Sequence, residues 1–281
     1  MRFPLLVFLL SFVGLALSAK MGTYLHKSLR WLDEEVRQDF NVIQASTLTL
    51  LGIIIGFSFS MAVSRYDQRK NCEAEEANAI GTEYLRLDLL PAVDAAAAKE
   101  LLRKYLDQRI AFYEVRNFSQ LEQINRDTVH VQSELWSAVH KGVVGQQQAV
   151  IALTVGGLND ALNSQGYTQA AWLNRIPLAA WLLMETVAFF GTLLTGMGAR
   201  RSNALICFVL PFVMSTALFL IADLDSPRRG LIRVQPQNLL SLAGSLNVRQ
   251  GDATPPAAAR VVIKGGRDAE YFVNKENLPG S

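Results

Sequence analysis

Four long apolar blocks constrain the fold of this chain more than any other feature of its sequence. They cover residues 3–19, 42–64, 176–197 and 204–222, and polar residues separate them. Half of the chain is hydrophobic, and its mean hydropathy of +0.18 lies above the negative values usual for water-soluble domains. Because a helix of about 20 apolar residues crosses the hydrocarbon core of a bilayer, the blocks predict four transmembrane helices.

The first block has two interpretations. Arg2, the apolar run after it and the residues "ALSA" at its end are typical of a secretory signal peptide, which would be cleaved. The same residues, 1–19, are also long enough to form a short first transmembrane helix. The residues alone leave both interpretations open.

The polar segment between the second and third blocks has helical periodicity. Leu102, Leu106 and Ile110 recur at helical spacing, with charged residues on the opposite face. Gly156 and Gly157 interrupt a later apolar stretch, and "NDALNSQGY" after them predicts a helix end or a loop. Since the two sides of the membrane carry nearly equal numbers of Lys and Arg, the charges do not decide the orientation, and we place this segment in the cytoplasm.

These patterns predict an all-α membrane protein in four parts. Residues 1–64 hold transmembrane helices 1 and 2, residues 65–174 form a helical cytoplasmic domain, and residues 175–223 hold helices 3 and 4. Residues 224–281 form a C-terminal tail, which is rich in Pro, Gly and Ala at its end. We expect the tail to be disordered after about residue 247.

The second block carries a row of small residues. Gly52, Gly56, Ser60 and Ser64 recur every four residues and therefore share one helix face. In lipid, small residues let two helix backbones approach closely, which favours helix association. The row predicts tight packing against another helix, either of this chain or of a neighbouring copy.

A second row, Thr49, Ile53 and Phe57, lies on the adjacent face of the same helix. If symmetric copies of the helix meet at a central axis, this row could ring that axis. A narrow ring of apolar side chains can exclude water and so block ions. The alternative is that the three side chains face lipid or another helix.

Several motifs resemble those of known membrane proteins. "IIIGFSFSMAVSRYDQR" is similar to the second transmembrane helix of the bestrophins. Roughly residues 5–245 are more closely similar to a family of bacterial bestrophin-like proteins of unknown function. The most specific motif is "EANAIGTEYLR" followed by "LP", and "LNDALN", "NRIP" and "DLDSPRRGLIRVQPQNLL" extend the resemblance.

The resemblance implies a fold and an activity. Bestrophins are pentameric anion channels, and three residues of their second helix form the pore neck, at positions that match Thr49, Ile53 and Phe57. By this resemblance the chain would be a homo-oligomer in the bacterial inner membrane, with residues 1–19 kept as a span. Tyr66 and Asp67 replace the bestrophin tryptophans, and no acidic calcium-clasp cluster is found, so calcium gating is not implied.

Three basic residues, Arg65, Arg69 and Lys70, follow the second block. They could concentrate inorganic anions at a pore mouth. They could instead anchor the helix at the membrane interface, with their aliphatic stems along apolar surface.

Glu185 lies inside the third block, where a carboxylate costs a few kcal/mol unless it is paired or protonated. One hypothesis gives Glu185 a function, for example as the centre of a proton-coupled transporter. The other gives it a structural hydrogen bond to a Ser, a Thr or Arg175.

Four glutamates, Glu73, Glu75, Glu76 and Glu83, lie close together after the second block. No histidine follows at the spacing of di-metal carboxylate sites, so we expect a solvated or ion-paired helix face and no metal site. Hydrolase and nucleotide-binding motifs are not found, and neither an enzyme nor a cofactor is indicated. The net charge of +2, with no basic stripe, also argues against nucleic-acid binding.

Together these features favour an oligomeric, anion-permeable ion channel in a lipid bilayer, with the second apolar helix lining its neck. The alternative is a non-conducting membrane scaffold or sensor whose helical domain binds a partner protein.

Overall fold

The computed structural model describes residues 3–28, 34–198 and 204–252. The chain divides into a compact unit, Met1–Ala243, and a C-terminal unit, Gly244–Ser281. The arrangement below is that of the first unit. The described residues form α-helices and one short 3-10 helix and contain no strand, which confirms the all-α class. We expected disorder after about residue 247. The described part of the chain ends at residue 252, so this expectation lies almost entirely outside the described residues.

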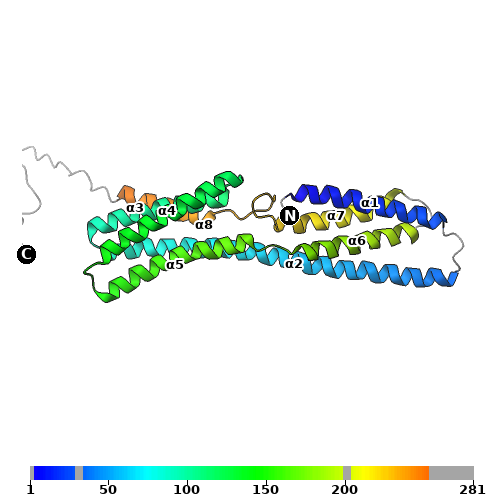
Figure 1. Ribbon diagram of the computed structural model, residues 1–281, viewed down its shortest axis with the longest axis horizontal. Coiled ribbons are helices and arrows are strands. Elements are labelled where there is room, and N and C mark those ends of the chain that lie inside the picture. The colour runs from blue at the N-terminus through cyan, green and yellow to red at the C-terminus, as the bar shows by residue number, and fades with distance from the viewer. Residues whose placement is uncertain (1–2, 29–33, 199–203, 253–281) are drawn as a thin grey trace, which may run out of the picture. The chain divides into compact units, whose positions relative to one another are not determined.

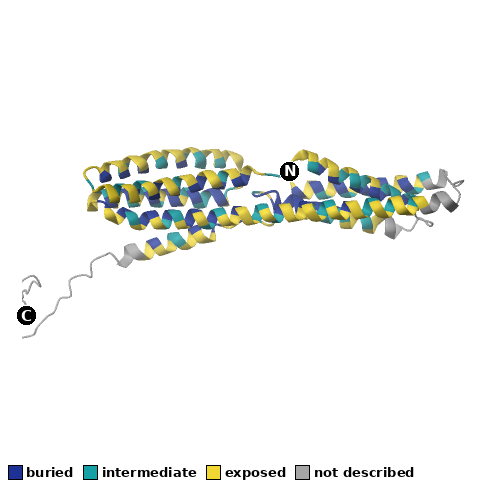
Figure 2. Cartoon of the chain, turned by 90° about the horizontal axis from the view of Figure 1, so that it is seen from below, coloured by how far each residue is buried: buried dark blue, intermediate teal, exposed yellow. Residues whose placement is uncertain are grey.

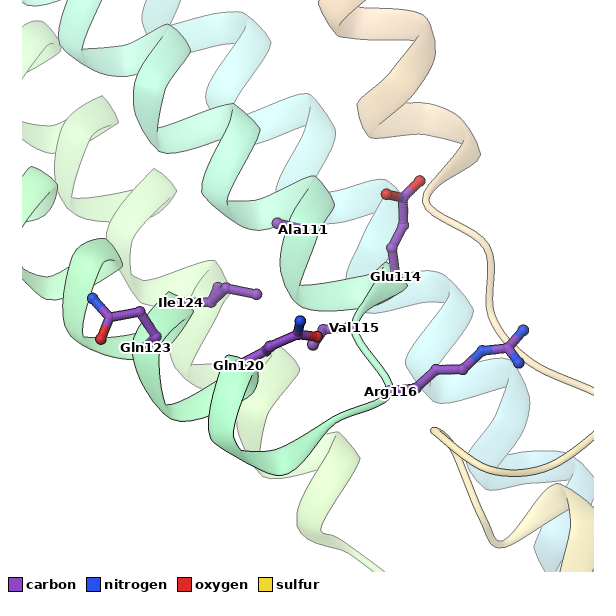
Figure 3. A pocket seen from close by; sticks show the side chains of 7 residues that line it. All are labelled: Ala111, Glu114, Val115, Arg116, Gln120, Gln123 and Ile124. Atoms are coloured by element: carbon purple, nitrogen blue, oxygen red, sulfur yellow. The ribbon is translucent and has the colours of Figure 1, made fainter.

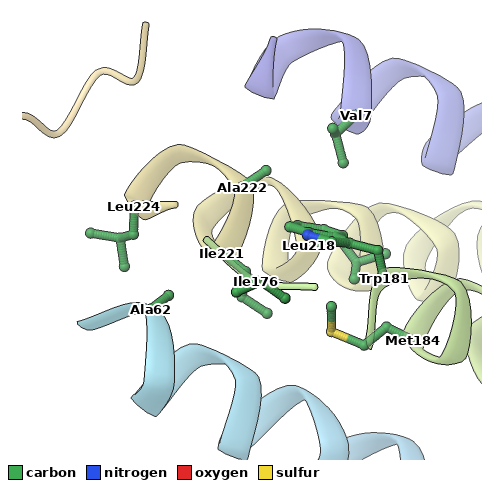
Figure 4. Packing of buried hydrophobic residues seen from close by; sticks show 9 residues of the cluster. All are labelled: Val7, Ala62, Ile176, Trp181, Met184, Leu218, Ile221, Ala222 and Leu224. Atoms are coloured by element: carbon green, nitrogen blue, oxygen red, sulfur yellow. The ribbon is translucent and has the colours of Figure 1, made fainter. Parts of the chain in front are cut away.

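Four helices form the apolar part of the fold. α1 (Pro4–Ser28) packs against α6 (Leu178–Gly198) and α7 (Ala204–Leu224), and both of these pack against the first half of α2 (Glu34–Arg86; Figure 1). A cluster of buried side chains joins the four helices (Figure 4). Its members are Val7, Ala62, Ile176, Trp181, Met184, Leu218, Ile221, Ala222 and Leu224.

Three further α-helices and the 3-10 helix η1 (Leu87–Leu89) surround the second half of α2. α5 (Gln148–Leu173) packs along α2, and α3 (Ala92–Glu114) packs against α4 (Phe118–Val143). α8 (Gln237–Asp252) begins beside α2. Buried residues gather where the helices face one another, and exposed residues cover the outward faces (Figure 2).

α2 is one continuous helix across the expected boundary between residues 64 and 65. No Gly or Pro stands between Phe57 and Gly81, so nothing in the sequence breaks the backbone hydrogen bonds there. Its 53 residues correspond to a length of about 80 Å, well beyond the thickness of a hydrocarbon core. The helix therefore carries its apolar half directly into the polar helical domain.

The expected helix end at "NDALNSQGY" is wrong, because α5 runs unbroken from Gln148 to Leu173. Gly157 faces the side chains of α2 at close range here. A Cβ atom at this position would collide with the side chains of Glu83 and Arg86 on α2. The glycine thus lets α5 approach α2 without interrupting the helix.

Three stretches within the described residues are long and apolar enough to cross a membrane, namely Pro4–Leu25, Asp39–Leu89 and Gln148–Gly198. In α7 the apolar stretch Phe208–Leu224 is shorter. Pro211 lies inside α7, which remains helical around it. The structure therefore supports three candidate spans by length and composition, and α7 covers the residues predicted for the fourth.

Candidate functional site

The outward face of α2 carries the row predicted to form a neck. Phe57 is 72% exposed and Ile53 is 51% exposed. Thr49, one turn before Ile53, is exposed as well. All three side chains therefore point away from the helices of their own chain.

The row of small residues lies on the same exposed side. Gly52, Gly56, Ser60 and Ser64 are all exposed. A Cβ atom added to Gly52 or Gly56 would meet no described atom within 4 Å. Within the described part of the chain, the row therefore packs against no other helix.

A close helix crossing lies instead between α1 and α6. A Cβ on Gly22 would collide with the carbonyl oxygen of Leu193, and a Cβ on Gly196 would collide with that of Ala19. Beside this crossing the Ser18 hydroxyl donates to the carbonyl oxygen of Phe189 at 2.7 Å. Our sequence analysis missed this contact, although Ser18 and Gly22 show the four-residue spacing of small residues that marks such crossings.

The three basic residues after the apolar part of α2 have different surroundings. Arg69 is only 1% exposed, and its guanidinium donates to the carbonyl oxygens of Ala171, Asn174 and Leu224 at 3.0–3.2 Å. Arg65 is half-buried, with Nη1 3.5 Å from Oδ1 of Asp225, whereas Lys70 is exposed. Arg69 therefore ties α2 to the ends of α5 and α7, and its burial argues against a role in collecting anions.

Glu185 has a hydrogen-bond partner within the chain. The Ser11 hydroxyl of α1 donates to Oε1 of Glu185 on α6. The carboxylate is half-buried. A polar contact thus joins the two helices inside the apolar part of the fold.

Three of the four glutamates that follow the second apolar block, Glu73, Glu76 and Glu83, are buried, so a solvated face is wrong for them, whereas the ion-paired alternative holds for Glu76. Glu73 accepts hydrogen bonds from the backbone N–H groups of Asn238 and Leu239, at 2.9 and 3.0 Å, and so caps the start of α8. Glu76 pairs with Arg109 and accepts from the hydroxyls of Tyr113 and Thr168 at 3.2 Å. Both are buried because other elements cover the second half of α2.

Glu83 is buried, and among the described residues its carboxyl group has no hydrogen-bond partner. Its side chain is fully shielded from solvent, and neither carboxylate oxygen accepts a hydrogen bond from any described group. The pKa of Glu83 is raised to about 8, mainly by burial, while the nearby charge of Arg86 lowers it and that of Asp160 raises it. The carboxyl group is therefore mainly protonated at neutral pH.

Comparison with known proteins decides the family. A profile of the bestrophin-like domain matches residues 16–239, most of the chain. The chain belongs to the bestrophin-like family. This confirms the resemblance found in the sequence. Comparison with curated proteins yields no match.

Solved structures share the bestrophin-like fold. A bacterial bestrophin homologue from Klebsiella pneumoniae is similar with a TM-score of 0.59 at 15% identity, over 85% of this chain and 98% of that one. A variant of that homologue with a single mutation gives a TM-score of 0.59 at 14% identity, over 84% and 99% of the two chains. At such low identity the likeness concerns the fold.

In this bestrophin-like chain a polar turn follows α7. Both carboxylate oxygens of Asp223 accept backbone N–H groups, from Leu231 at 2.7 Å and from Ile232 at 2.8 Å. Arg228 donates from Nη1 to the carbonyl oxygens of Phe112 and Val115. The two bonds of Arg228 fasten the turn to the helical domain.

Arg228 also stacks on aromatic rings. Its guanidinium lies 4.5 Å from the ring centre of Phe112 and 4.4 Å from that of Trp172. The guanidinium of Arg109 also lies 4.5 Å from the Phe112 ring centre. Burial, together with the positive charges of Arg109 and Arg175, lowers the pKa of Arg228 to about 10. No sequence motif pointed to Arg109, which is buried by tertiary packing.

Two surface depressions lie near the link between α3 and α4. The first has a volume of about 590 Å³ and is lined by Ala111, Glu114, Val115, Arg116, Gln120, Gln123 and Ile124 (Figure 3). In Figure 3 Arg116 points away from the two glutamines, toward the segment that follows α7. The second depression, which we call the arginine pocket, is lined by Arg116, Asn117, Arg228, Arg229 and Gly230 and has a volume of about 520 Å³.

Proposed function

We propose that the chain is the subunit of an oligomeric anion channel in the bacterial inner membrane, with α2 lining its axis. The observation that carries the proposal is the outward face of α2. There the apolar residues Ile53 and Phe57 are exposed beside a row of small residues that contacts no other described helix. Membership of the bestrophin-like family supports a channel rather than an enzyme.

The two rows suit a ring of helices. Helix association in lipid depends on close backbone approach, which Gly52 and Gly56 allow. If the small residues of one α2 contact the next copy, the adjacent row of Thr49, Ile53 and Phe57 turns toward the axis. The bestrophins, to which the family is similar, form pentamers, and we propose a ring of that kind here.

The neck would control permeation by its apolar surface. Water leaves a narrow passage ringed by Ile53 and Phe57, and an ion cannot cross without its hydration shell. Thr49 makes one end of the neck less apolar. Lys70, which is exposed, and Arg65 would raise the local concentration of anions, whereas the buried Arg69 would hold the neighbouring helices in place.

For the topology we propose four spans, with α7 as the fourth one and residues 65–174 in the cytoplasm. Cleavage after residue 19 would remove Ser11 and leave Glu185 without the hydrogen bond that it accepts. An intramembrane carboxylate without a partner is costly. This supports α1 as a retained span, and N-terminal sequencing of the purified protein tests it.

Anion flux in reconstituted liposomes tests the channel. Wild-type protein should conduct chloride, and Phe57→Ala and Ile53→Ala should raise the flux because each widens and hydrates the neck. Phe190→Ala is the matched control, since Phe190 is an exposed phenylalanine on α6. Absent flux, or flux that changes equally in all three variants of a correctly assembled protein, argues against the proposal.

The alternative is a non-conducting scaffold or sensor. One observation favours it, namely that α4 exposes Val129 and Trp136, which share a helix face and could contact a partner protein. In that case the exposed row on α2 would face lipid. An assembled oligomer without flux, in which Phe57 is labelled by a lipid-soluble probe, would support the alternative.

A further inference from the structure

Three arginines from two distant segments of the sequence lie together at the arginine pocket. Arg116 comes from the link between α3 and α4, and Arg228 and Arg229 come from the turn after α7. Gly230 and Asn117 complete the lining. The pocket is open to solvent on one side, since Arg116 and Arg229 are exposed.

The turn that carries two of the arginines is held firmly. A Cβ atom at Gly230 would lie 2.5 Å from the carbonyl oxygen of Asp223 and 2.9 Å from that of Ser226, so only glycine fits this turn. Arg228 is fixed by its two backbone carbonyl acceptors and by the ring of Trp172. The charge of Arg228 is therefore positioned before any ligand arrives.

Arg116, Arg228 and Arg229 form no ion pair with any acidic side chain of the described residues. Asp223 accepts two backbone N–H groups, and Asp225 accepts the N–H of Ile176 beside Arg65. Three guanidinium groups around one depression repel one another, and a bound anion would relieve this repulsion.

The pocket lies where two apolar helices end. The Arg229 guanidinium stacks 4.5 Å from the ring centre of Phe3, the residue directly before α1 and its candidate span Pro4–Leu25. The turn itself starts where the apolar stretch of α7 ends, at Leu224. A group at this level would meet the headgroups of a bilayer that surrounds α1 and α7.

We propose that the arginine pocket binds a phosphate group, either that of an anionic phospholipid or that of free phosphate. The planar guanidinium donates paired hydrogen bonds to phosphate oxygens, which makes arginine well suited to this ligand. Basic pockets at the membrane surface are typical binding sites for anionic headgroups. The proposal does not depend on ion conduction, and it holds equally for a scaffold.

The test uses the full-length protein, purified in detergent and stripped of lipid. Native mass spectrometry measures binding of phosphatidylglycerol and, as the uncharged comparison, phosphatidylcholine. Calorimetric titration measures binding of inorganic phosphate. The test variant is R116Q/R229Q, which changes the two exposed arginines and leaves the half-buried Arg228 in place. The matched control, K104Q/R126Q, removes the same charge from exposed positions outside the pocket.

Wild type and the control should retain phosphatidylglycerol in preference to phosphatidylcholine, and R116Q/R229Q should bind it about tenfold or more weakly. R116K/R229K keeps the charge but loses the paired donors, and it should bind with intermediate affinity. If the two lipids bind alike while phosphate binding is lost in R116Q/R229Q, the ligand is free phosphate. Three results would overturn the proposal. They are binding of phosphatidylglycerol and of phosphate that is as strong in R116Q/R229Q as in wild type, a loss of binding in the control as large as that in R116Q/R229Q, and no binding of either probe by wild type.

Discussion

Glu76 and Arg109 form an ion pair that is completely buried between α2 and α3. The carboxylate is further satisfied by the hydroxyls of Tyr113 and Thr168. The Arg109 guanidinium has two nitrogens without a hydrogen-bond partner among the described residues. The pair therefore joins the long helix to the helical domain, and each partner depends on the other for charge compensation.

Removing one partner of this pair should destabilise the protein strongly. Glu76→Gln leaves the Arg109 charge buried, at an expected cost of about 3–5 kcal/mol in the free energy of unfolding. Glu100→Gln, which breaks the exposed Glu100–Lys104 pair, should cost less than about 1 kcal/mol. Thermal unfolding in detergent measures both variants. Similar stabilities would show that the buried pair is not a structural link.

The stability of the protein should fall with rising pH because of Glu83. Its pKa is about 8 in the folded state against about 4.3 in an unfolded chain. Between these values the folded state holds a proton that the unfolded state has lost, so the contribution of Glu83 to stability is fully present below about pH 4 and is lost as pH rises through 8.

Glu83→Gln tests this pH dependence because the amide stays neutral at every pH. The melting temperature of the variant should change less than that of wild type between pH 5 and 9, and at pH 9 it should be the higher of the two. Glu100→Gln, at an exposed position, should follow the wild-type profile. Parallel profiles for wild type and Glu83→Gln would contradict the assignment.

Substitutions at Ser11 and Glu185 distinguish two roles of the Glu185 carboxyl group, a structural hydrogen bond and a part in transport. Ser11→Ala removes the donor, and leaving the carboxylate without it should cost about 1–3 kcal/mol. Glu185→Gln keeps an acceptor oxygen and should retain both the assembly and the chloride flux of a channel. Loss of flux in Glu185→Gln, with the oligomer intact, would point to a proton-coupled transporter instead. Liposome flux and gel filtration of both variants provide the measurements.

Periodicity in the sequence predicted the helices well, because an apolar or amphipathic run of sufficient length depends only on local spacing. It could not predict where Gly157 or Gly196 would be used, since close packing depends on which helix lies opposite. For the same reason Glu73 and Glu76 were expected at the surface. Their burial follows from elements more than 30 residues away, and no local pattern marks Arg109 or the start of α8 as their partners.

The glycines of the chain should fall into two groups with different effects. Gly22→Val inserts a side chain into the crossing of α1 and α6, where the added Cβ alone already collides with backbone. It should prevent correct folding of the single chain, and yield and melting temperature should both fall. Overpacking of this kind usually costs 1–3 kcal/mol or more.

Gly52→Val meets open space within its own chain, so the fold of the single subunit should survive. If the row of small residues contacts a neighbouring copy, the substitution should separate α2 helices and reduce the subunit number. Light scattering coupled to gel filtration measures that number in detergent and in nanodiscs. Val93→Ala, a change at an exposed position of α3, serves as the neutral comparison. An unchanged oligomer in Gly52→Val would mean that this face of α2 meets lipid, and the proposed ring around α2 would have to be abandoned.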